Sequence, residues 1–332
     1  MSLRDNPLGR GTLRVSELAF GAAGIGNLFT PVSDAQAEQA VSAAWEGGVR
    51  YFDTAPHYGL GLSERRLGAA LRGLPRDEYV VSTKVGRLLS PRTETTGDDL
   101  ANGFAVPATH ERVWDFTADG VRRSLEASLE RLGLDRIDLV YVHDPDDHAE
   151  QALTEAYPAL EALRAEGIVG AIGVGMNQAG LLARFVRETD IDTVLLAGRY
   201  TLLDQRGLTE LLPLAAERGV DVVVGGVFNS GLLADPRPGA TFDYVTAPDD
   251  VLARAIALRT VCEDHGVPLR AAALRFPFGH RAVTSVLVGA RSAAEAQDAA
   301  AMVRTPVPAA LWAELKERGL LPADVPTPEG TG

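Results

Sequence analysis

Four polar side chains lie at or just beyond the ends of three short apolar stretches. Arg50–Asp53 ends in a carboxylate, and Tyr58 follows it in a loop broken by proline and glycine. Tyr79–Lys84 ends in a lysine, and Ile137–Asp144 carries His143. If the three stretches are neighbouring parallel strands, these side chains meet at one rim. A phenol beside an ammonium group and an imidazole could then transfer protons.

The chemistry depends on all four groups acting together. A free phenol has a pKa near 10 and is a weak base at neutral pH, but a nearby ammonium group lowers that pKa. Asp53 would hold Lys84 charged and in place, and His143 could position a reacting oxygen. Singly, each residue has an ordinary explanation: a turn cap for Asp53, a surface aromatic for Tyr58, a strand-end charge for Lys84, a core histidine for His143. Their occurrence on three strands favours the functional interpretation.

The rest of the chain alternates between short apolar strands and amphipathic helices. The eight predicted strands are Leu18–Ala23, Arg50–Asp53, Tyr79–Lys84, Ile137–Asp144, Gly170–Met176, Thr193–Tyr200, Asp221–Phe228 and Val283–Val288. They are rich in Val, Ile and Leu, as buried parallel strands are. Eight strand–helix units favour a closed (β/α)8 TIM barrel over an open doubly wound sheet. We expect a single domain over residues 1–332, with a C-terminal extension and a loosely ordered tail at 322–332.

Two connections are longer than a barrel requires, Gly86–Phe116 after the third strand and Asn229–Asp249 after the seventh. Both follow strands, on the face where barrel enzymes carry out chemistry. The first contains Trp114 and Phe116 in a polar setting. Two interpretations are open: the aromatic residues hold the loop down, or they form a lid that contacts substrate.

Composition excludes several classes of protein. The 332-residue chain has a net charge of −13, which argues against a nucleic-acid surface. Its one cysteine, Cys262, permits no intrachain disulfide and is expected to be a buried, inert thiol. We found no signal peptide, membrane-spanning stretch or metal-ligand spacing, so we expect a cytoplasmic protein without a metal. The sequence does not indicate the oligomeric state.

With these residues in place, the chain resembles the aldo-keto reductase superfamily over essentially its whole length. The residues that carry the resemblance are Phe52–Gly59, Gly61–Glu64, Ser82–Gly86, Val142–Asp144 and Gly173–Asn177. Within the superfamily it looks most like the branch of aldose 1-dehydrogenases (L-fucose and D-threo-aldose dehydrogenases) and pyridoxal 4-dehydrogenase. Leu195–Asp204 and Phe228–Leu233 carry that closer similarity.

The resemblance implies a barrel without a Rossmann domain, a nicotinamide cofactor, and hydride transfer at a carbonyl or hemiacetal carbon. It makes Tyr58 the catalytic acid/base, Lys84 and Asp53 the pair that tunes it, and His143 the residue that orients the substrate oxygen. His57 either contacts substrate hydroxyls or shapes the turn.

The resemblance also implies where the cofactor binds. The adenosine half falls at the turn after the last strand, where Gly289 and Ala290 precede a helix whose free amides can receive a phosphate. Arg291 matches a residue that packs on adenine or contacts the ribose phosphate. A carboxylate at Glu295 would repel a 2′-phosphate, so we expect NAD to be preferred over NADP; the alternative is that Glu295 is a solvated helix residue. The loop around the pyrophosphate comprises Phe228, Asn229, Ser230, Gly231 and Leu232.

Two positions depart from the family pattern. Gly225 stands where many members stack a tyrosine on the nicotinamide, and Ala197 stands where a glutamine partners Asn177. The nicotinamide is therefore expected to be held differently, with help from Arg199 or Phe228.

The sequence-based interpretation is an NAD(P)-dependent oxidoreductase that oxidises an aldose such as L-fucose at C1 to the lactone. The alternatives are pyridoxal 4-dehydrogenase or another small-aldehyde or alcohol oxidoreductase, and a non-catalytic, nicotinamide-binding sensor subunit. The intact set of four residues argues against the sensor. A phosphate-sugar isomerase barrel would need a strand-end glutamate base and no dinucleotide.

Overall fold

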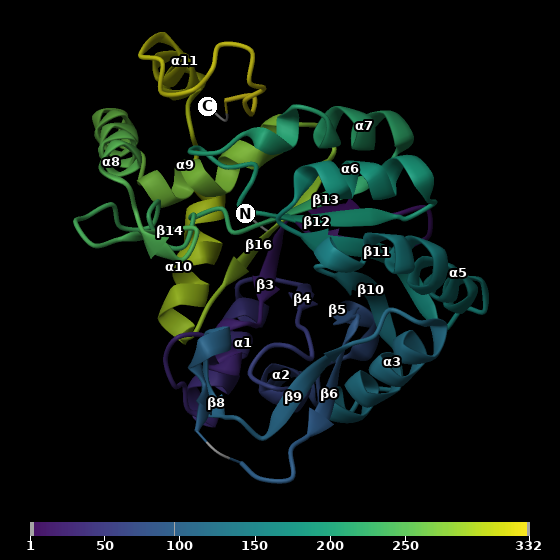
Figure 1. The fold of residues 1–332 in the computed structure, drawn as a ribbon. Coiled ribbons are helices and arrows are strands. Elements are labelled where there is room, and N and C mark those ends of the chain that lie inside the picture. The colour runs from purple at the N-terminus through teal and green to yellow at the C-terminus, as the bar shows by residue number, and fades with distance from the viewer. Residues whose placement is uncertain (1–2, 96, 331–332) are drawn as a thin grey trace.

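Eight parallel strands close into a barrel in the computed structural model, which describes residues 3–95 and 97–330 (Figure 1). The strands are β3 (Leu18–Gly21), β4 (Tyr51–Asp53), β5 (Val80–Val85), β10 (Ile137–His143), β11 (Val169–Met176), β12 (Thr193–Ala197), β13 (Asp221–Gly225) and β16 (Val283–Gly289). They follow this order around the ring, and β16 pairs with β3 to close it. The predicted (β/α)8 barrel is confirmed.

Helices surround the barrel on the outside (Figure 1). They are α1 (Asp34–Glu46), α2 (Leu62–Leu71), α3 (Ala118–Leu132), α4 (Ala149–Gln151), α5 (Tyr157–Ala165), α6 (Ala179–Glu188), α7 (Leu211–Arg218), α8 (Asp249–Asp264), α9 (Leu269–Arg275), α10 (Ala293–Arg304) and α11 (Ala309–Glu317). A π-helical turn, Ala152–Ala156, joins α4 to α5. Local sequence sets the ends: Ser33 and Gln36 form a capping box on α1, and Gly133 ends α3 in a left-handed conformation.

Two predicted strands are shorter in the structure than in the sequence interpretation. β12 stops at Ala197 and β13 stops at Gly225. The next residues, Gly198 and Gly226, take positive φ angles of 68° and 64°, which turn the backbone out of the sheet. The segments beyond them therefore belong to the rim of the barrel.

An N-terminal hairpin closes the amino-terminal end of the barrel. β1 (Asp5–Pro7) pairs antiparallel with β2 (Arg14–Ser16). Leu8 and Val15 are fully buried and pack in the same cluster as the lumen residues Tyr51, Leu139 and Tyr141. The amino-terminal part of the lumen is thus filled by side chains.

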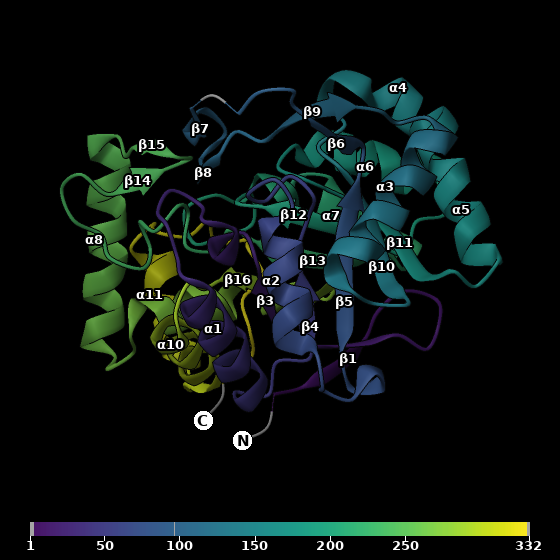
Figure 2. The ribbon, with the colours of Figure 1, turned by 90° about the horizontal axis from the view of Figure 1, so that it is seen from below.

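Both long connections contain strands of their own. The first folds as two antiparallel pairs, β6 (Arg87–Pro91) with β9 (His110–Trp114) and β7 (Asp98–Asp99) with β8 (Phe104–Pro107). The second contains the small hairpin of β14 (Thr241–Phe242) and β15 (Val245–Thr246). Figure 2 shows both insertions on the side of the barrel opposite the chain termini. They flank the carboxyl ends of the strands, where the candidate residues lie.

The C-terminal tail packs against the body, although its composition predicts loose order. Val325 is 2% exposed and belongs to the main core cluster. Pro326 and Thr327 lie so close to Gly279 that a Cβ there would clash with them. The described part of the tail is therefore in contact with the rest of the chain at Val325 and around Gly279.

Two further expectations concern the single cysteine and membrane-spanning helices. Cys262 is fully buried in α8, as predicted, and burial raises the pKa of its thiol to about 12, which disfavours the reactive thiolate. Across residues 3–95 and 97–330, no helix is sufficiently long and apolar to cross a bilayer.

Candidate active site

Three adjacent strands deliver the predicted residues to one rim. In the β4–β5 ladder Asp53 lies opposite Ser82, and in the β5–β10 ladder Lys84 lies opposite Tyr141. His143 is the last residue of β10, and Tyr58 follows β4 in the loop to α2. Since all three strands are parallel, their carboxyl ends face the same mouth. The structure therefore brings Asp53, Tyr58, Lys84 and His143 together.

A buried ion pair lies at the centre of the cluster. Nζ of Lys84 donates to Oδ2 of Asp53 at 2.6 Å and to the carbonyl oxygen of Thr54 at 2.9 Å. Both side chains of the pair are at least 98% buried. Burial disfavours the ammonium form, but the negative charge of Asp53 and contact with Tyr58 outweigh it and raise the pKa of Lys84. Lys84 thus carries a positive charge at neutral pH.

That charge acts on Tyr58. Nζ of Lys84 lies 4.7 Å from the centre of the Tyr58 ring. Burial raises the pKa of the phenol, the charge of Lys84 lowers it, and Asp53 raises it again, leaving the pKa above its ordinary value. The phenol is therefore protonated at neutral pH without substrate, and Lys84 is the group that most reduces the cost of its ionisation.

Two histidine rings complete a cup around the phenol. His143 lies edge-on to Tyr58, with ring centres 5.9 Å apart, and His57 is 5.9 Å from His143 and 6.1 Å from Tyr58. Burial and the charges of Arg87 and Lys84 lower the pKa of His143 well below its usual value. His143 is consequently neutral, so one of its ring nitrogens donates a hydrogen bond and the other accepts one.

A chain of hydroxyls supports the ion pair from inside the lumen. Oγ of Ser82 donates to Oδ1 of Asp53 at 2.7 Å and lies 3.1 Å from the hydroxyl of Tyr51. That hydroxyl lies 3.1 Å from the hydroxyl of Tyr141. Both oxygens of the Asp53 carboxylate therefore have donors, as a buried charge requires.

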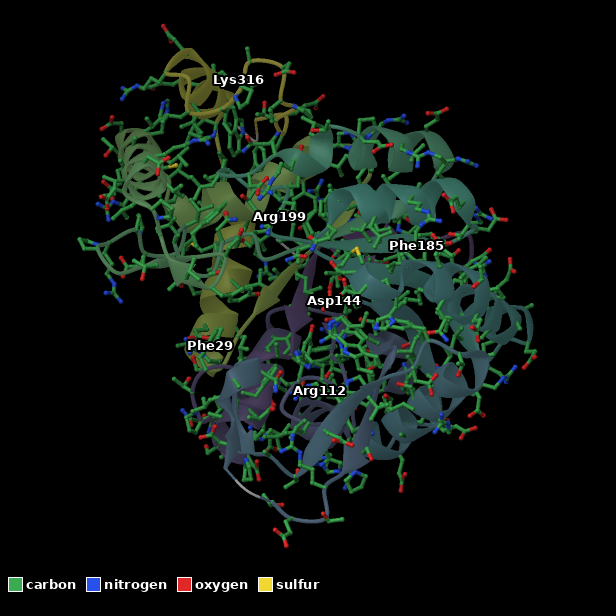
Figure 3. All side chains as sticks on the ribbon, viewed as in Figure 1. Phe29, Arg112, Asp144, Phe185, Arg199 and Lys316 are labelled. Carbon is green, nitrogen blue, oxygen red and sulfur yellow. The ribbon has the colours of Figure 1, made fainter. Side chains whose placement is uncertain are left out.

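A hollow of about 340 Å³ adjoins the cup on the side of His143. Its lining consists of Arg87, Trp114, Asp144, Asp146, Asp147, His148 and Asn177. The Arg87 guanidinium pairs with Asp144 and lies 4.4 Å from the centre of the Trp114 ring. Figure 3 places Asp144 at the mouth of the barrel. The hollow offers an aromatic face beside carboxylates.

The two predicted substrate-binding aromatic residues differ in position. Trp114 is 46% exposed and faces the hollow. Phe116 is fully buried, stacked on Trp114 at 5.9 Å and packed against Gly86. Phe116 therefore holds the insertion down and supports Trp114, and in this conformation it cannot contact substrate.

A second, longer groove of about 740 Å³ runs from the β13 loop to the start of α10. Of the residues predicted to bind cofactor, those that line it are Phe228, Ser230, Gly231, Gly289, Arg291 and Glu295. Asn229, Leu232 and Ala290 are buried and do not line it. Its volume is that of a typical small-molecule site.

Two predicted cofactor residues lie elsewhere. Asn177 is exposed and lines the 340 Å³ hollow. Arg199 donates to Asp243 at 2.8 Å and lies 3.8 Å from Asp204, so its charge is already neutralised. Arg199 thereby ties the β12 loop to the β14–β15 turn, and its part in holding the nicotinamide stays a prediction.

The two departures from the family pattern are direct neighbours, since Ala197 pairs with Gly225 across β12 and β13. The nearest side chains to a Cβ built at Gly225 are those of Leu195 and Leu287, at 3.5 and 3.8 Å. Small and aliphatic groups therefore surround the carboxyl ends of β12 and β13.

Charges at the far end of the groove are paired. The carboxylate of Glu295 accepts from the backbone N–H of Arg291 at 2.7 Å and lies 3.5 Å from its guanidinium. Arg270 donates twice to Asp298, both at 2.9 Å. Each arginine at this end thus has its own carboxylate.

An aromatic pair from two loops lies over the groove. The rings of Phe29 and Tyr244 are 5.9 Å apart, although these residues are 53% and 69% exposed. Both line the groove, and both have positive φ angles. We call this pair the aromatic clasp.

Sequence reasoning missed the clasp, the Arg270–Asp298 pair and the hydroxyl chain below Asp53. The alternation of β5 could have revealed Ser82, because residues two apart share a strand face with Lys84. No local pattern marks Phe29 or Tyr244. Among the described residues, no group of three or more His, Cys, Asp or Glu side chains is placed to hold a metal ion.

Comparison with known proteins assigns the family. A model described as "Aldo/keto reductase family" matches residues 17–318. The chain is 50% identical over 315 residues to a D-threo-aldose 1-dehydrogenase of a Pseudomonas species, covering 93% of this chain and 96% of the relative. It is 42% identical over 334 residues to pyridoxal 4-dehydrogenase of Microbacterium luteolum, covering 95% and 97%.

Solved structures agree with the sequence matches. An aldo-keto reductase from Bacillus halodurans, in its holo form, superposes with a TM-score of 0.75 at 27% identity and covers 97% of this chain and 98% of that one. The barrel, the residues gathered at its mouth and these similarities lead to one assignment: the chain belongs to the aldo-keto reductase family and is an oxidoreductase.

Proposed function

We propose that the protein is an NAD-dependent aldose 1-dehydrogenase that oxidises a pyranose such as L-fucose at C1 to the lactone. The observation that carries the proposal is the charged Lys84, held by Asp53 at 2.6 Å and lying 4.7 Å from the centre of the Tyr58 ring. The 50% identity to a D-threo-aldose 1-dehydrogenase supports the choice of substrate.

In the proposed reaction the C1–H bond breaks as a hydride leaves, the O1–H bond breaks as a proton leaves, and C1 and O1 form the carbonyl of the lactone. A bound nicotinamide supplies the acceptor for the hydride. Tyr58 must first ionise, which the charge of Lys84 makes less costly, and its phenolate then takes the O1 proton and becomes a neutral phenol. His143, neutral and edge-on to Tyr58, donates to O1 and orients it.

The residues around the long groove suit a dinucleotide. The N-terminus of α10 borders it, and the amides of Ala293 and Ala294 have no hydrogen-bond partner in the described part of the chain. Such amides favour phosphate and ribose oxygens. Near the mouth, Ala197 and Gly225 would let a flat ring lie close to the backbone.

A preference for NAD follows from the pairing of charges at the adenosine end. A 2′-phosphate needs a surplus of positive charge, but Arg291 is paired with Glu295 and Arg270 with Asp298. We expect Glu295→Gln to raise catalytic efficiency with NADP relative to NAD about fivefold, because a partly exposed charge is worth about 1 kcal/mol. Glu126→Gln, an exposed carboxylate on α3, is the matched control. An unchanged ratio would contradict the role of Glu295.

The test is a spectrophotometric screen at 340 nm with NAD and NADP against aldoses and pyridoxal. We expect turnover of an aldose with NAD, and loss of nearly all turnover in Tyr58→Phe while the variant folds and binds cofactor. The 42% identity to pyridoxal 4-dehydrogenase makes pyridoxal oxidation the second candidate. Cofactor binding without turnover of any aldose or aldehyde would instead favour a sensor.

A further inference from the structure

The insertion after β5 reaches the cup through one arginine. Arg112, on β9, has a side chain only 11% exposed, and it donates to both oxygens of the buried Asp99 carboxylate at 2.8 and 2.6 Å. Figure 3 shows Arg112 toward the barrel mouth, within the molecule. Burying two charged side chains costs desolvation free energy, which is offset only when the pair has good geometry and further hydrogen bonds.

Arg112 also donates two hydrogen bonds to His57. Its Nε donates to Nδ1 of the imidazole at 2.5 Å, and Nη2 donates to the His57 carbonyl oxygen at 3.0 Å. A guanidinium group has donors only, so Nδ1 must be the acceptor and carries no proton. A neutral ring bonded in this way has its single proton on Nε2.

The surroundings keep the ring neutral. Burial and the positive charges of Arg87, Arg112 and Lys84 lower the pKa of His57 to about 2. The groups that face it are Arg112 and Phe104 from the insertion, Tyr58 from its own loop, and His143 from β10. His57 is therefore uncharged throughout the physiological range.

The proton on Nε2 has no acceptor in the described part of the chain. The ring lies 6.1 Å from Tyr58 and 5.9 Å from His143, centre to centre, and its Nδ1 is bonded to Arg112, so Nε2 is the ring nitrogen left for a group bound beside Tyr58 and His143. When the reacting oxygen of a substrate lies between Tyr58 and His143, the oxygen on the carbon next to the reacting carbon lies toward the ring of His57.

We propose that His57 donates from Nε2 to the hydroxyl on the carbon next to the reacting carbon, and that Arg112 is the positioning residue that fixes this tautomer. The site would then select α-hydroxy carbonyl compounds and their hemiacetals, which include aldoses, over simple aldehydes and 2-deoxy sugars. This inference rests on the proposed function for its substrate but not for the tautomer.

The competing explanation is that Arg112 only holds the turn. The bond from Nη2 to the His57 carbonyl would be sufficient for that purpose, and it would leave the imidazole free to adopt either tautomer. The second bond, from Nε to Nδ1, is the one that determines which nitrogen carries the proton.

The first experiment does not need turnover. Nitrogen-15 NMR of histidine-labelled protein distinguishes the two neutral tautomers. We expect the wild-type His57 signal, assigned by its loss in His57→Gln, to report Nε2–H only from pH 5 to 8. Arg112→Met should give a mixture, and Arg92→Met, an exposed arginine on the same insertion, should match the wild type. A wild-type signal from Nδ1–H would overturn the proposal.

The second experiment compares L-fucose with 2-deoxy-L-fucose. We expect His57→Phe to lower kcat/KM about tenfold for L-fucose, the usual effect of one lost hydrogen bond, and less than about twofold for the deoxy sugar. His57→Gln should recover most of the loss, because its amide nitrogen can occupy the position of Nε2. Equal losses on both sugars would overturn the donor role, whereas absence of turnover on any aldose by the wild type would count against the proposed function and leave the NMR result standing.

Discussion

Removal of the Lys84 charge tests the proton-transfer mechanism most directly. We expect Lys84→Met to lower kcat for aldose oxidation and to move the rise of kcat with pH to higher pH. The direction of this shift follows because the reaction requires the phenolate of Tyr58 as its base. Tyr58 accepts a proton, burial already raises the pKa of its phenol, and the charge of Lys84 is what opposes that rise. Without Lys84, phenolate character is harder to reach at any given pH.

The magnitude can be estimated from one distance. A phenolate carries its charge mainly on oxygen, and we take the 4.7 Å from Nζ of Lys84 to the centre of the Tyr58 ring as the scale of the separation. Unit charges at that separation interact by about 3.5 kcal/mol at an effective dielectric constant near 20. In bulk water the same pair would interact by about 1 kcal/mol. Since about 1.4 kcal/mol is a tenfold change in rate, the buried value predicts a fall in kcat of about 300-fold and the water value about fivefold. Because the ion pair is almost fully buried, we expect a loss near the larger figure.

A loss of stability has to be separated from a loss of catalysis. Lys84→Met leaves the Asp53 carboxylate buried without its cation, which typically costs about 3–5 kcal/mol. The double variant Asp53→Asn/Lys84→Met removes both charges and should unfold at a temperature close to that of the wild type. It should nonetheless remain as slow as Lys84→Met, because Tyr58 still lacks the ammonium group.

The assay is kcat against pH from 6 to 10 with saturating NAD and L-fucose, with NADH binding followed by tryptophan quenching to show that the cofactor site is intact. The reasoning would be refuted by a double variant that is stable, binds NADH and keeps kcat within about threefold of the wild type. A reduced kcat with an unmoved pH profile would also refute it, since Lys84 would then act on something other than the phenol.

Three further predictions use other parts of the site. Ser82→Ala removes the donor to Oδ1 of Asp53 and should lower the free energy of unfolding by about 2 kcal/mol, measured by urea titration, with a smaller effect on kcat than Lys84→Met. Tyr244→Ala removes one ring of the aromatic clasp and should speed NADH release about threefold to tenfold in stopped-flow fluorescence, with Phe29→Ala giving the same change. Because the pKa of His143 is lowered, kcat/KM should show no ionisation near pH 6.5; a limb there that disappears in His143→Asn would contradict a neutral histidine.

The catalytic part of the site could be anticipated because it lies on regular structure. Asp53, Lys84 and His143 each come at or near the carboxyl end of an apolar stretch, and parallel strands necessarily align those ends. Three local patterns then become one cluster once the strands are neighbours. Local sequence signals also mark the helix ends, as the Ser33–Gln36 capping box of α1 and the glycine after α3 illustrate.

The sequence predicted only part of the cofactor groove. Gly289 ends β16, Arg291 lies in the turn after it, and Glu295 lies in the first turn of α10, so their place at the mouth was predictable. The position of Arg199 was not, because its partner Asp243 is 44 residues later and lies in a hairpin of two-residue strands. Pairing of this kind depends on how two loops meet, and neither loop carries a periodic signal.

The residues whose positions could be predicted and those whose positions could not also differ in their proposed roles. Tyr58, which is proposed to transfer the proton, lies in the loop after β4. The side chains that support it, Asp53, Lys84 and His143, lie on barrel strands whose pairing sets their positions. The groups proposed to choose the substrate depend on the insertion: its Arg112 orients His57, its Arg87 pairs with Asp144, and its Trp114 lines the hollow. An insertion can change length and sequence without disturbing the ladder between β4, β5 and β10. Relatives with the same four residues can therefore act on different substrates, and substrate choice in this chain is best sought in residues 87–114.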